Sequence, residues 1–255
     1  MNRSLLFAKR NLTELSRDVL SYIFCIAFPV VMLIVMSVLN ASIPKEAHMT
    51  VFRIDNLSGG ILVFGQTFVM LFTAVLVATD KSTSFLMRLY ASPMKSRHFI
   101  HGYIIPMLMI SVVQSLVTIV SSLLIAWITG VSLKLPGLLL AVFTSLPSAL
   151  MFISIGLIFG TLFNEKSAPG ICSVIISLGS FLGGVFFDAE GVGGVMYTIC
   201  KCMPFIYCTK TARASIRLEL DWESFGLPFV IIILTALVFM SLAIAVFRSR
   251  MKADR

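Results

Sequence analysis

The chain has 255 residues, of which 58% are hydrophobic and only 13% charged, and its formal net charge is +8. Soluble domains carry about 25% charged residues, so this composition excludes an ordinary soluble protein. The mean hydropathy of +0.99 predicts an integral membrane protein. Its apolar runs are continuous and do not alternate in polarity as membrane barrel strands do, so the expected fold class is all-α.

The N-terminal segment predicts an amphipathic helix that precedes the first apolar run. Apolar residues recur there at spacings of three and four, and basic residues occupy the other faces. A helix of this kind lies in the plane of the membrane interface. Two roles stay open, a membrane anchor and an elbow that touches a cytoplasmic partner. The apolar stripe consists of Leu5, Ala8, Leu12, Leu15 and Val19.

Six apolar runs are long enough to cross a membrane, because about 20 helical residues span a hydrocarbon core about 30 Å thick. The boundary between the third and fourth runs rests on the turn-like stretch TGVSLKLPG. The first run is too long for a signal peptide and is expected to stay in the protein. The predicted spans are residues 20–39, 58–79, 102–129, 135–163, 167–187 and 224–247.

The distribution of Lys and Arg predicts the orientation of these spans, since cytoplasmic loops hold an excess of both. With the N-terminus inside, the outer segments contain seven of the 20 basic residues, and the inner segments hold the rest. Both termini are therefore expected in the cytoplasm. The high net charge is then a signal of topology and of attraction to anionic membrane lipid, and not a nucleic-acid surface. The outer basic residues are Lys45, Arg53, Lys134, Lys201, Lys210, Arg213 and Arg217.

The predicted spans hold no charged residue or histidine well inside them, which argues against a proton-coupled carrier or an intramembrane hydrolase. His48, His98 and His101 fall in loops or at span ends without metal-ligand spacing, so no catalytic residue and no metal site is expected. The chain also lacks a GxxxxGK[ST] phosphate loop. We expect no bound cofactor, and any ATP must be hydrolysed by another subunit.

Gln66 and Gln114 are the main polar side chains of the spans. They are expected to form hydrogen bonds between helices or, alternatively, to contact a substrate. Two small-residue pairs, Gly156 with Gly160 and Gly179 with Gly183, fit the spacing that lets helices approach closely. These pairs predict tight packing either within the subunit or at a dimer face.

The largest inner loop, residues 80–101, interrupts the apolar sequence with the polar and basic stretch DKSTSFLMRLYASPMKSRHFIH. Phe85, Leu86, Leu89 and Tyr90 make one apolar stripe at helical spacing. A Ser or Thr near residue 82 could cap this helix, and Ser92-Pro93 would end it. The short helix at 82–93 is shaped to dock in a groove of a soluble protein, although a solvated loop that fixes topology explains it as well.

Two groups of residues give the chain a resemblance to the type-2 permeases of ATP-binding-cassette exporters. In the first group an acidic residue, a Leu-rich Ser-Pro helix end, a Gly, a Pro and a Gln follow one another: Asp80, Leu89, Ser92, Pro93, Gly102, Pro106 and Gln114. The second group is a Gly-rich turn with aromatics and a later Pro-aromatic-Arg series: Gly179, Gly183, Gly184, Phe186, Phe187, Pro204, Phe205, Tyr207 and Arg213. Ser82, Phe85 and Tyr103 depart from the residues usual in the family.

The resemblance implies two membrane subunits that work with two ATPase subunits, which bind ATP and Mg²⁺. It also implies that the loop helix sits in a cleft of the ATPase and that the closing of the ATPase moves the spans through this helix. A rigid element must bridge the two proteins, since ATP can bias the helix bundle only through differential contacts. The resemblance leaves a homodimer and a heterodimer equally possible. The residues expected at the ATPase are Asp80, Phe85, Leu86, Leu89, Ser92, Pro93 and Arg97.

The outer loop at residues 188–223 is half apolar and can dip into the bilayer, where related permeases have short re-entrant helices. Phe186, Phe187, Pro204 and Phe205 are candidates for a gate, with interfacial anchoring as the equal alternative. Cys200, Cys202 and Cys208 could form one disulfide, but we expect free, packed thiols.

Spans rich in Phe, Met and Leu suit an amphipathic drug, antibiotic or peptide as the exported compound, with a lipid-linked glycan as an alternative. Multidrug export from a bacterial inner membrane is the resulting expectation. A stand-alone carrier or channel and a non-transporting membrane scaffold are the competing hypotheses.

Overall fold

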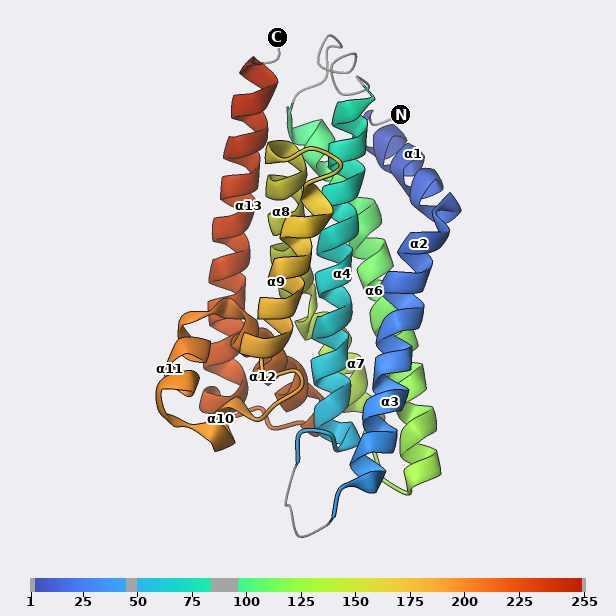
Figure 1. The fold of residues 1–255 in the computed structure, drawn as a ribbon, viewed down its shortest axis with the longest axis vertical. Coiled ribbons are helices and arrows are strands. Elements are labelled where there is room, and N and C mark those ends of the chain that lie inside the picture. Colours follow the sequence, from blue (N-terminus) through green and yellow to red (C-terminus); the bar gives the residue numbers. More distant parts are fainter. Residues whose placement is uncertain (1–2, 45–49, 84–95, 254–255) are drawn as a thin grey trace.

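The computed structural model describes residues 3–44, 50–83 and 96–253, and every regular element in these ranges is a helix (Figure 1). The all-α prediction is confirmed. The N and C ends of the chain lie at the same end of the bundle, which we call the proximal end; the opposite end is the distal end. Five helical stretches are long and apolar enough to cross a membrane: Val19–Ser42, Ile54–Ser82, His98–Thr129, Leu135–Leu162 and Trp222–Met251.

The first of these stretches is built from three consecutive helical segments. It follows α1 (Arg3–Arg17) and consists of α2 (Val19–Tyr22), a π-helical turn (Ile23–Ala27) and α3 (Phe28–Ser42). The carboxylate of Asp18 begins it by accepting a hydrogen bond from the Leu20 amide, at 3.1 Å. The helix thus changes direction between the interface and the span at a defined cap.

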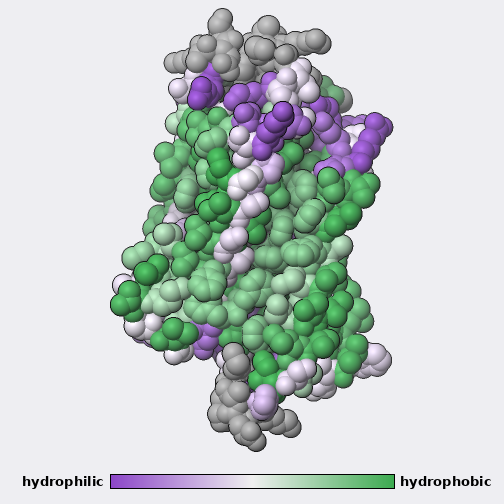
Figure 2. Space-filling model, viewed as in Figure 1, coloured by the Kyte–Doolittle hydropathy of each residue, from purple (hydrophilic) through white to green (hydrophobic). Residues whose placement is uncertain are grey.

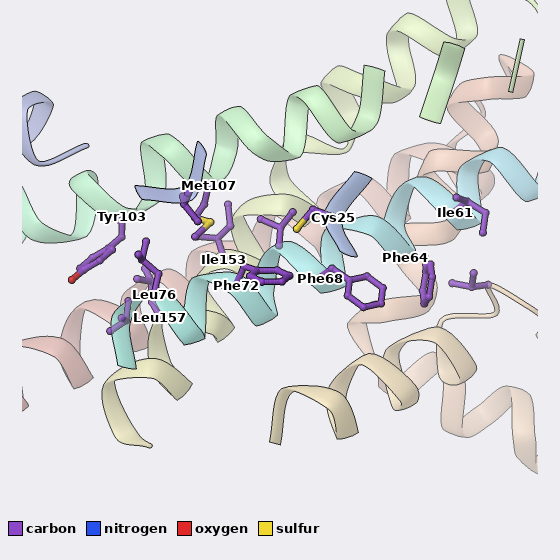
Figure 3. Close-up of a cluster of buried hydrophobic side chains, with 14 of the residues drawn as sticks. Cys25, Ile61, Phe64, Phe68, Phe72, Leu76, Tyr103, Met107, Ile153 and Leu157 are labelled. Carbon is purple, nitrogen blue, oxygen red and sulfur yellow. The ribbon is translucent and has the colours of Figure 1, made fainter. Parts of the chain in front are cut away.

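Helix α4 (Ile54–Ser82) is the central helix, and it packs against α3, α6, α8, α9 and α12. Phe64, Phe68 and Phe72 recur every four residues along it and line one side of the buried cluster in Figure 3. Its other side faces α8 (Leu146–Leu162). This double coverage explains why α4 is buried along nearly its whole length.

Two glycines of α8 allow this helix to approach α4 closely. A Cβ atom added at Gly156 would lie 2.4 Å from the Met70 carbonyl oxygen, and one at Gly160 would lie 2.6 Å from that of Ala74. Only residues without a side chain fit against a neighbouring backbone at this distance. Of the two packing roles predicted for this pair, the structure shows packing within the subunit.

The third and fourth predicted spans begin and end close to the expected residues, and the fourth is interrupted. Helix α6 (Ser96–Thr129) crosses once and contains Pro106. Helix α7 (Leu135–Thr144) is separated from α8 at Ser145. Pro147, which lies in the first turn of α8, has no amide hydrogen to donate and so favours a break at this point. The stretch Thr144-Ser145-Leu146-Pro147-Ser148 was the signal of this break, and the hydropathy of the surrounding run concealed it.

The fifth predicted span, residues 167–187, is too long. Helix α9 (Ala168–Leu182) has 15 residues and ends at a turn through Gly183 and Gly184. Gly184 has a φ of +66°, a conformation that other residues rarely adopt, so the helix cannot continue. This helix is apolar but shorter than the five stretches above, and hydropathy alone does not reveal where it stops.

The predicted outer loop folds as a group of short helices at the distal end (Figure 1). They are α10 (Ala189–Val192), α11 (Gly194–Cys202) and α12 (Pro204–Arg217), followed by a π-helical turn (Trp222–Gly226) and α13 (Leu227–Ala253). Helix α12 packs on α4, α7 and α13, and therefore belongs to the bundle.

The surface of the molecule has the pattern of a membrane protein. Hydrophobic residues cover the middle, whereas hydrophilic residues gather at the proximal end (Figure 2). The stretch within Trp222–Met251 has only 17% of its most apolar window buried, against 89% for α4. The exposed apolar side chains of α3 and α13 therefore face either lipid or another subunit.

Candidate functional site

The proximal end holds a buried ion pair that joins three helices. Asp80 on α4 is 1% exposed, and Nη1 of Arg10 on α1 lies 2.7 and 2.8 Å from its two carboxylate oxygens. The Tyr103 hydroxyl on α6 donates a third hydrogen bond at 2.8 Å. We call Arg10, Asp80 and Tyr103 the Asp80 cluster. Two donors thus satisfy a carboxylate that burial would otherwise destabilise.

Helix α1 is fixed to α6 by packing beside this cluster. The Phe7 ring meets those of Phe99 and Tyr103 edge to face, with centroids 5.8 and 5.0 Å apart. Asn11 is fully buried, and its amide donates to the Gly102 carbonyl at 3.0 Å. A Cβ at Gly102 would lie 2.1 Å from the Phe7 ring, so this position needs glycine.

The predicted apolar stripe of α1 is only partly the buried face. Ala8 and Leu15 are buried, whereas Leu5 and Val19 are more than half exposed. The stripe was predicted from hydrophobicity alone. The face of α1 that is buried in the structure lies toward α6 and includes Phe7 and the polar Asn11. Asn11 could not be found from periodicity, because its burial depends on a carbonyl contributed by another helix.

Glu14 adds a second carboxylate to the cluster. Its Oε2 lies 2.8 Å from Arg10 Nη2, one helical turn along α1. Burial raises the pKa of this carboxyl above its usual value, the Arg10 charge lowers it, and the Asp80 charge raises it further. Arg10 is thus shared between two acids, one buried and one half-exposed.

The end of α4 also contacts the turn between α8 and α9. The Lys81 ammonium donates to the Thr161 carbonyl at 3.0 Å, and the Ser82 hydroxyl donates to Glu165 Oε2 at 2.8 Å. Ser82 therefore binds an acid from a neighbouring turn. The start of the inner loop is held by α1, by α6 and by the α8–α9 turn together.

Most residues predicted to contact an ATPase lie outside the described residues. Of that set, the structure places Asp80 in the cluster above, where its side chain is buried. Arg97 lies in the first turn of α6, and its side chain is outside the described part. Also outside it are Phe85, Leu86, Leu89, Ser92 and Pro93.

Gln66 forms hydrogen bonds at the break between α7 and α8. Its amide nitrogen donates to the Ser145 carbonyl at 3.1 Å, and Ser148 Oγ donates to its Oε1 at 2.6 Å. Gln66 and Ser148 are both buried. The side chain thus supplies a donor to a carbonyl near the point where the helix is interrupted, as buried polar groups require.

Gln114 lies against the same helix, α4, from α6. Its Nε2 donates to Thr118 Oγ1 at 3.1 Å and approaches the Leu62 carbonyl at 3.4 Å. A Cβ at Gly65 would lie 2.0 Å from Nε2, so glycine makes room for this side chain. Gln66 and Gln114 therefore both form hydrogen bonds within the subunit, and neither lines one of the described cavities.

The predicted gate residues do not form one cluster. Phe186 packs edge to face on Phe64 with centroids 5.3 Å apart, and Phe187 lies 4.9 Å from Phe181. Phe205 stacks on Phe152 at 5.9 Å. Pro204 begins α12. Phe186, Phe187 and Phe205 thus pack on α4, α9 and α8 at separate places.

Arg213 on α12 binds the start of α4 and the turn after α9. Its Nε donates to the Asn56 carbonyl at 3.1 Å, and Nη2 donates to the Gly184 carbonyl at 2.8 Å. A Cβ at Gly59 would lie 2.8 Å from the Arg213 amide, so α12 crosses closely over α4. The resemblance included Arg213 without a role. The adjacent Gly59 and Gly60, which the sequence analysis missed, are the signal that could have indicated this crossing.

The five cysteines are free thiols, as expected for the three in the outer segment. Cys200 and Cys208 are buried, and Cys202 is exposed. Burial raises the pKa of the Cys200 thiol, which favours its protonated form.

Comparison with family models matches residues 4–217 to the ABC-2 type transporter family. The matched region covers α1 to α12 and therefore includes the Asp80 cluster, the break at Ser145 and the Arg213 contacts. A search of curated proteins found no match to this chain.

Proposed function

This chain belongs to the ABC-2 type transporter family, and on that premise we propose that it is the membrane subunit of an ATP-driven exporter. Its cargo in this proposal is an amphipathic drug, antibiotic or peptide-like compound. ATP and Mg²⁺ bind to a separate ATPase, two copies of which serve two membrane subunits. The supporting observation is the Asp80 cluster, which ties the loop expected at the ATPase to α1 and α6.

We infer six membrane crossings from the positions of the chain ends. Five crossings would place the two ends of the chain at opposite ends of the bundle, yet both lie at the proximal end (Figure 1). Helix α9 must then cross as well. Its 15 residues extend about 22 Å, a short span that a locally thinned bilayer can accommodate. The proximal end, which is rich in hydrophilic residues, is the cytoplasmic one in this proposal.

The distal helices fit the proposed re-entrant arrangement. Helix α11 buries Cys200 and leaves Val195 and Ile199 exposed. Apolar side chains exposed on a helix of nine residues suit a position at the outer border of the bilayer. Helix α12 lies between this border and the bundle, where its backbone is covered by protein, as a helix that enters without crossing requires.

A second membrane subunit is supported by the exposed face of α9. Gly170, Ser173 and Ser177 are exposed and lie on this face. Small residues at such spacing let helices approach closely in a membrane. We place the neighbouring subunit against this face, with the bacterial inner membrane as the location of the complex.

In this proposal, movement of the ATPase reaches the spans because the inner loop is rigidly connected to α1, α4 and α6. The inner loop leaves α4 after Asp80 and returns at α6 before Tyr103. Because one carboxylate binds both α1 and α6, a displacement of the loop moves three helices together. A helix bundle with two arrangements can then switch from one to the other when the ATPase closes.

The test is co-expression and co-purification with an ATP-binding-cassette ATPase from the same genome, followed by measurement of ATP hydrolysis. We expect the wild type to retain the ATPase and a Leu89→Asp variant to lose it. Leu220→Asp is the matched control, because Leu220 is exposed and belongs to the distal segment. Retention of the ATPase by Leu89→Asp would exclude this loop as the contact. A wild type that retains none would favour a carrier or a scaffold.

A further inference from the structure

A groove of about 580 Å³ runs along the outer side of α1, the side that does not face α6. Three of its lining residues are basic and one is acidic. The opposite side of the same helix carries Phe7 and Asn11, which are buried against α6. The groove is therefore open to the surroundings of the bundle. It is lined by Leu6, Lys9, Arg10, Thr13, Glu14 and Arg17.

The basic residues of the groove differ in their partners. Arg10 binds the carboxylates of Asp80 and Glu14, so its charge is matched by acids of the protein. Lys9 and Arg17 are exposed, and neither forms an ion pair within the part of the chain that the structure describes. The groove thus holds two positive charges that the described residues do not neutralise.

Asp18 follows Arg17 in the sequence, but its carboxylate is engaged elsewhere. It accepts hydrogen bonds from the Leu20 amide and the Ser21 hydroxyl, at the start of the first span. Asp18 therefore caps a helix, and the Arg17 guanidinium stays without an acidic partner.

Lys9, Thr13 and Arg17 follow one another at intervals of four residues, which places them in one row along the helix. At the rise of an α-helix, Lys9 and Arg17 are about 12 Å apart along the axis. Thr13 between them is short, and its hydroxyl donates back to the Lys9 carbonyl at 2.9 Å. A phosphate group above Thr13 can therefore accept hydrogen bonds from both long side chains, one from each end of the row.

The groove lies where the hydrophilic end of the molecule meets its hydrophobic middle. Hydrophilic residues surround α1 at the upper right of Figure 2, directly above the hydrophobic surface of α2 and α3. Leu6 in the groove is 45% exposed, and Leu20 at the start of the adjoining span is 58% exposed. The headgroups of a bilayer occupy such a level, with the acyl chains beside the span. A free phosphate would leave these leucines uncovered, whereas an acyl chain would cover them.

We propose that the groove of α1 binds the phosphate-bearing headgroup of an anionic membrane lipid, from the leaflet at the proximal end. In this assignment Lys9 and Arg17 donate to the phosphate oxygens from either side of Thr13, and an acyl chain lies against Leu20. A lipid fits better than a protein, because the exposed apolar surface continues from α1 into the span. The proposal requires only that the chain spans a membrane, and it is independent of the exported compound and of the ATPase.

The test measures binding of a fluorescent phosphatidylglycerol to the purified full chain in neutral detergent. The double variant Lys9→Gln/Arg17→Gln is expected to bind about tenfold more weakly, because charge-assisted hydrogen bonds are lost. The matched control is Lys166→Gln/Arg250→Gln, which removes one lysine and one arginine from exposed positions at the same end. Lys9→Arg/Arg17→Lys is expected to retain the binding, since both charges remain. Unchanged binding in Lys9→Gln/Arg17→Gln would overturn the site.

Three competitors identify the part of the lipid that is recognised. Unlabelled phosphatidylglycerol is expected to displace the probe, and diacylglycerol without phosphate is expected to fail. Inorganic phosphate is expected to need a concentration at least about a hundredfold higher, because it gains nothing from contact with the leucines. Equal competition by phosphate or by diacylglycerol would overturn the lipid assignment.

Co-purification with the ATPase separates this inference from the proposed function. We expect Lys9→Gln/Arg17→Gln to retain the ATPase as well as the wild type does. Loss of the ATPase by this variant, together with unchanged lipid binding, would assign the groove to the ATPase and overturn the lipid site. A wild type that binds the lipid through Lys9 and Arg17 but retains no ATPase would support the lipid site and contradict the proposed function alone.

Discussion

The two ends of the bundle use arginine in opposite ways. At the proximal end Arg10 binds a buried carboxylate, so charge is matched and three helices are joined. At the distal end Arg213 binds neutral carbonyls and lines an open cavity. The comparison shows that an arginine stabilises a helix junction in either setting. The two junctions differ in their acceptors, which are a carboxylate for Arg10 and backbone carbonyls for Arg213.

Removal of Arg10 is expected to have the largest effect, because it leaves the Asp80 carboxylate buried without its cation. Arg10→Met should lower the free energy of unfolding by about 3–5 kcal/mol. The double variant Arg10→Met/Asp80→Asn should recover part of this loss, since no charge then stays buried. Thermal unfolding in detergent measures both. Lys9→Met, an exposed neighbour, is the control and should change little. Additive effects of the two changes would contradict a coupled pair.

Arg213→Met breaks the distal junction and is expected to cost about 1.5–3 kcal/mol, because carbonyls at Asn56 and Gly184 lose a charged donor. Unfolding monitored by Trp fluorescence measures it, since Trp222 lies in the distal segment. Arg213→Lys should recover little, as an ammonium cannot reproduce two directions of donation. Full recovery by lysine would show that charge, and not geometry, holds α12 in place.

Gly156→Ala tests the packing of α8 on α4, the contact that lies between the two ends of the bundle. The added methyl would lie 2.4 Å from a backbone oxygen, so the two helices must move apart, at a cost of about 1–3 kcal/mol. Gly170→Ala on α9 is the matched control, since nothing lies within 4 Å of its added methyl. Equal melting temperatures for the two variants would disprove close packing at Gly156.

Glu14 is expected to give the smallest effect, through pH. Because burial raises its pKa, the folded chain holds this proton more tightly than the unfolded chain does. Its stabilising contribution is therefore present at low pH and is lost as pH rises above about 4.5 through the folded pKa. The side chain is half-exposed, so the change should stay below about 1 kcal/mol. Melting temperatures of wild type and Glu14→Gln, compared between about pH 4 and pH 7, should diverge over this window.

Much of the fold could be predicted because a bilayer imposes simple rules. The length and apolarity of α4, α6 and α13 identify them as crossing helices without any partner. Hydropathy did not reveal the end of α9, since the helix stops at a glycine turn that α12 then covers. In the candidate site, the motif contained Asp80 and Arg213, but their contacts come from residues 23 to 157 positions away on other elements.

The sequence by itself determined the class of protein, its apolar helices and its family resemblance, because hydrophobicity and motif order are local properties. The tertiary structure alone decided that Tyr103 and Arg10 share Asp80, that Gln66 supports the break at Ser145, and that lysines converge on Tyr197. Each of these contacts joins different helices or depends on how a helix is turned. Its energy exists only after packing has excluded water and fixed the direction of each side chain.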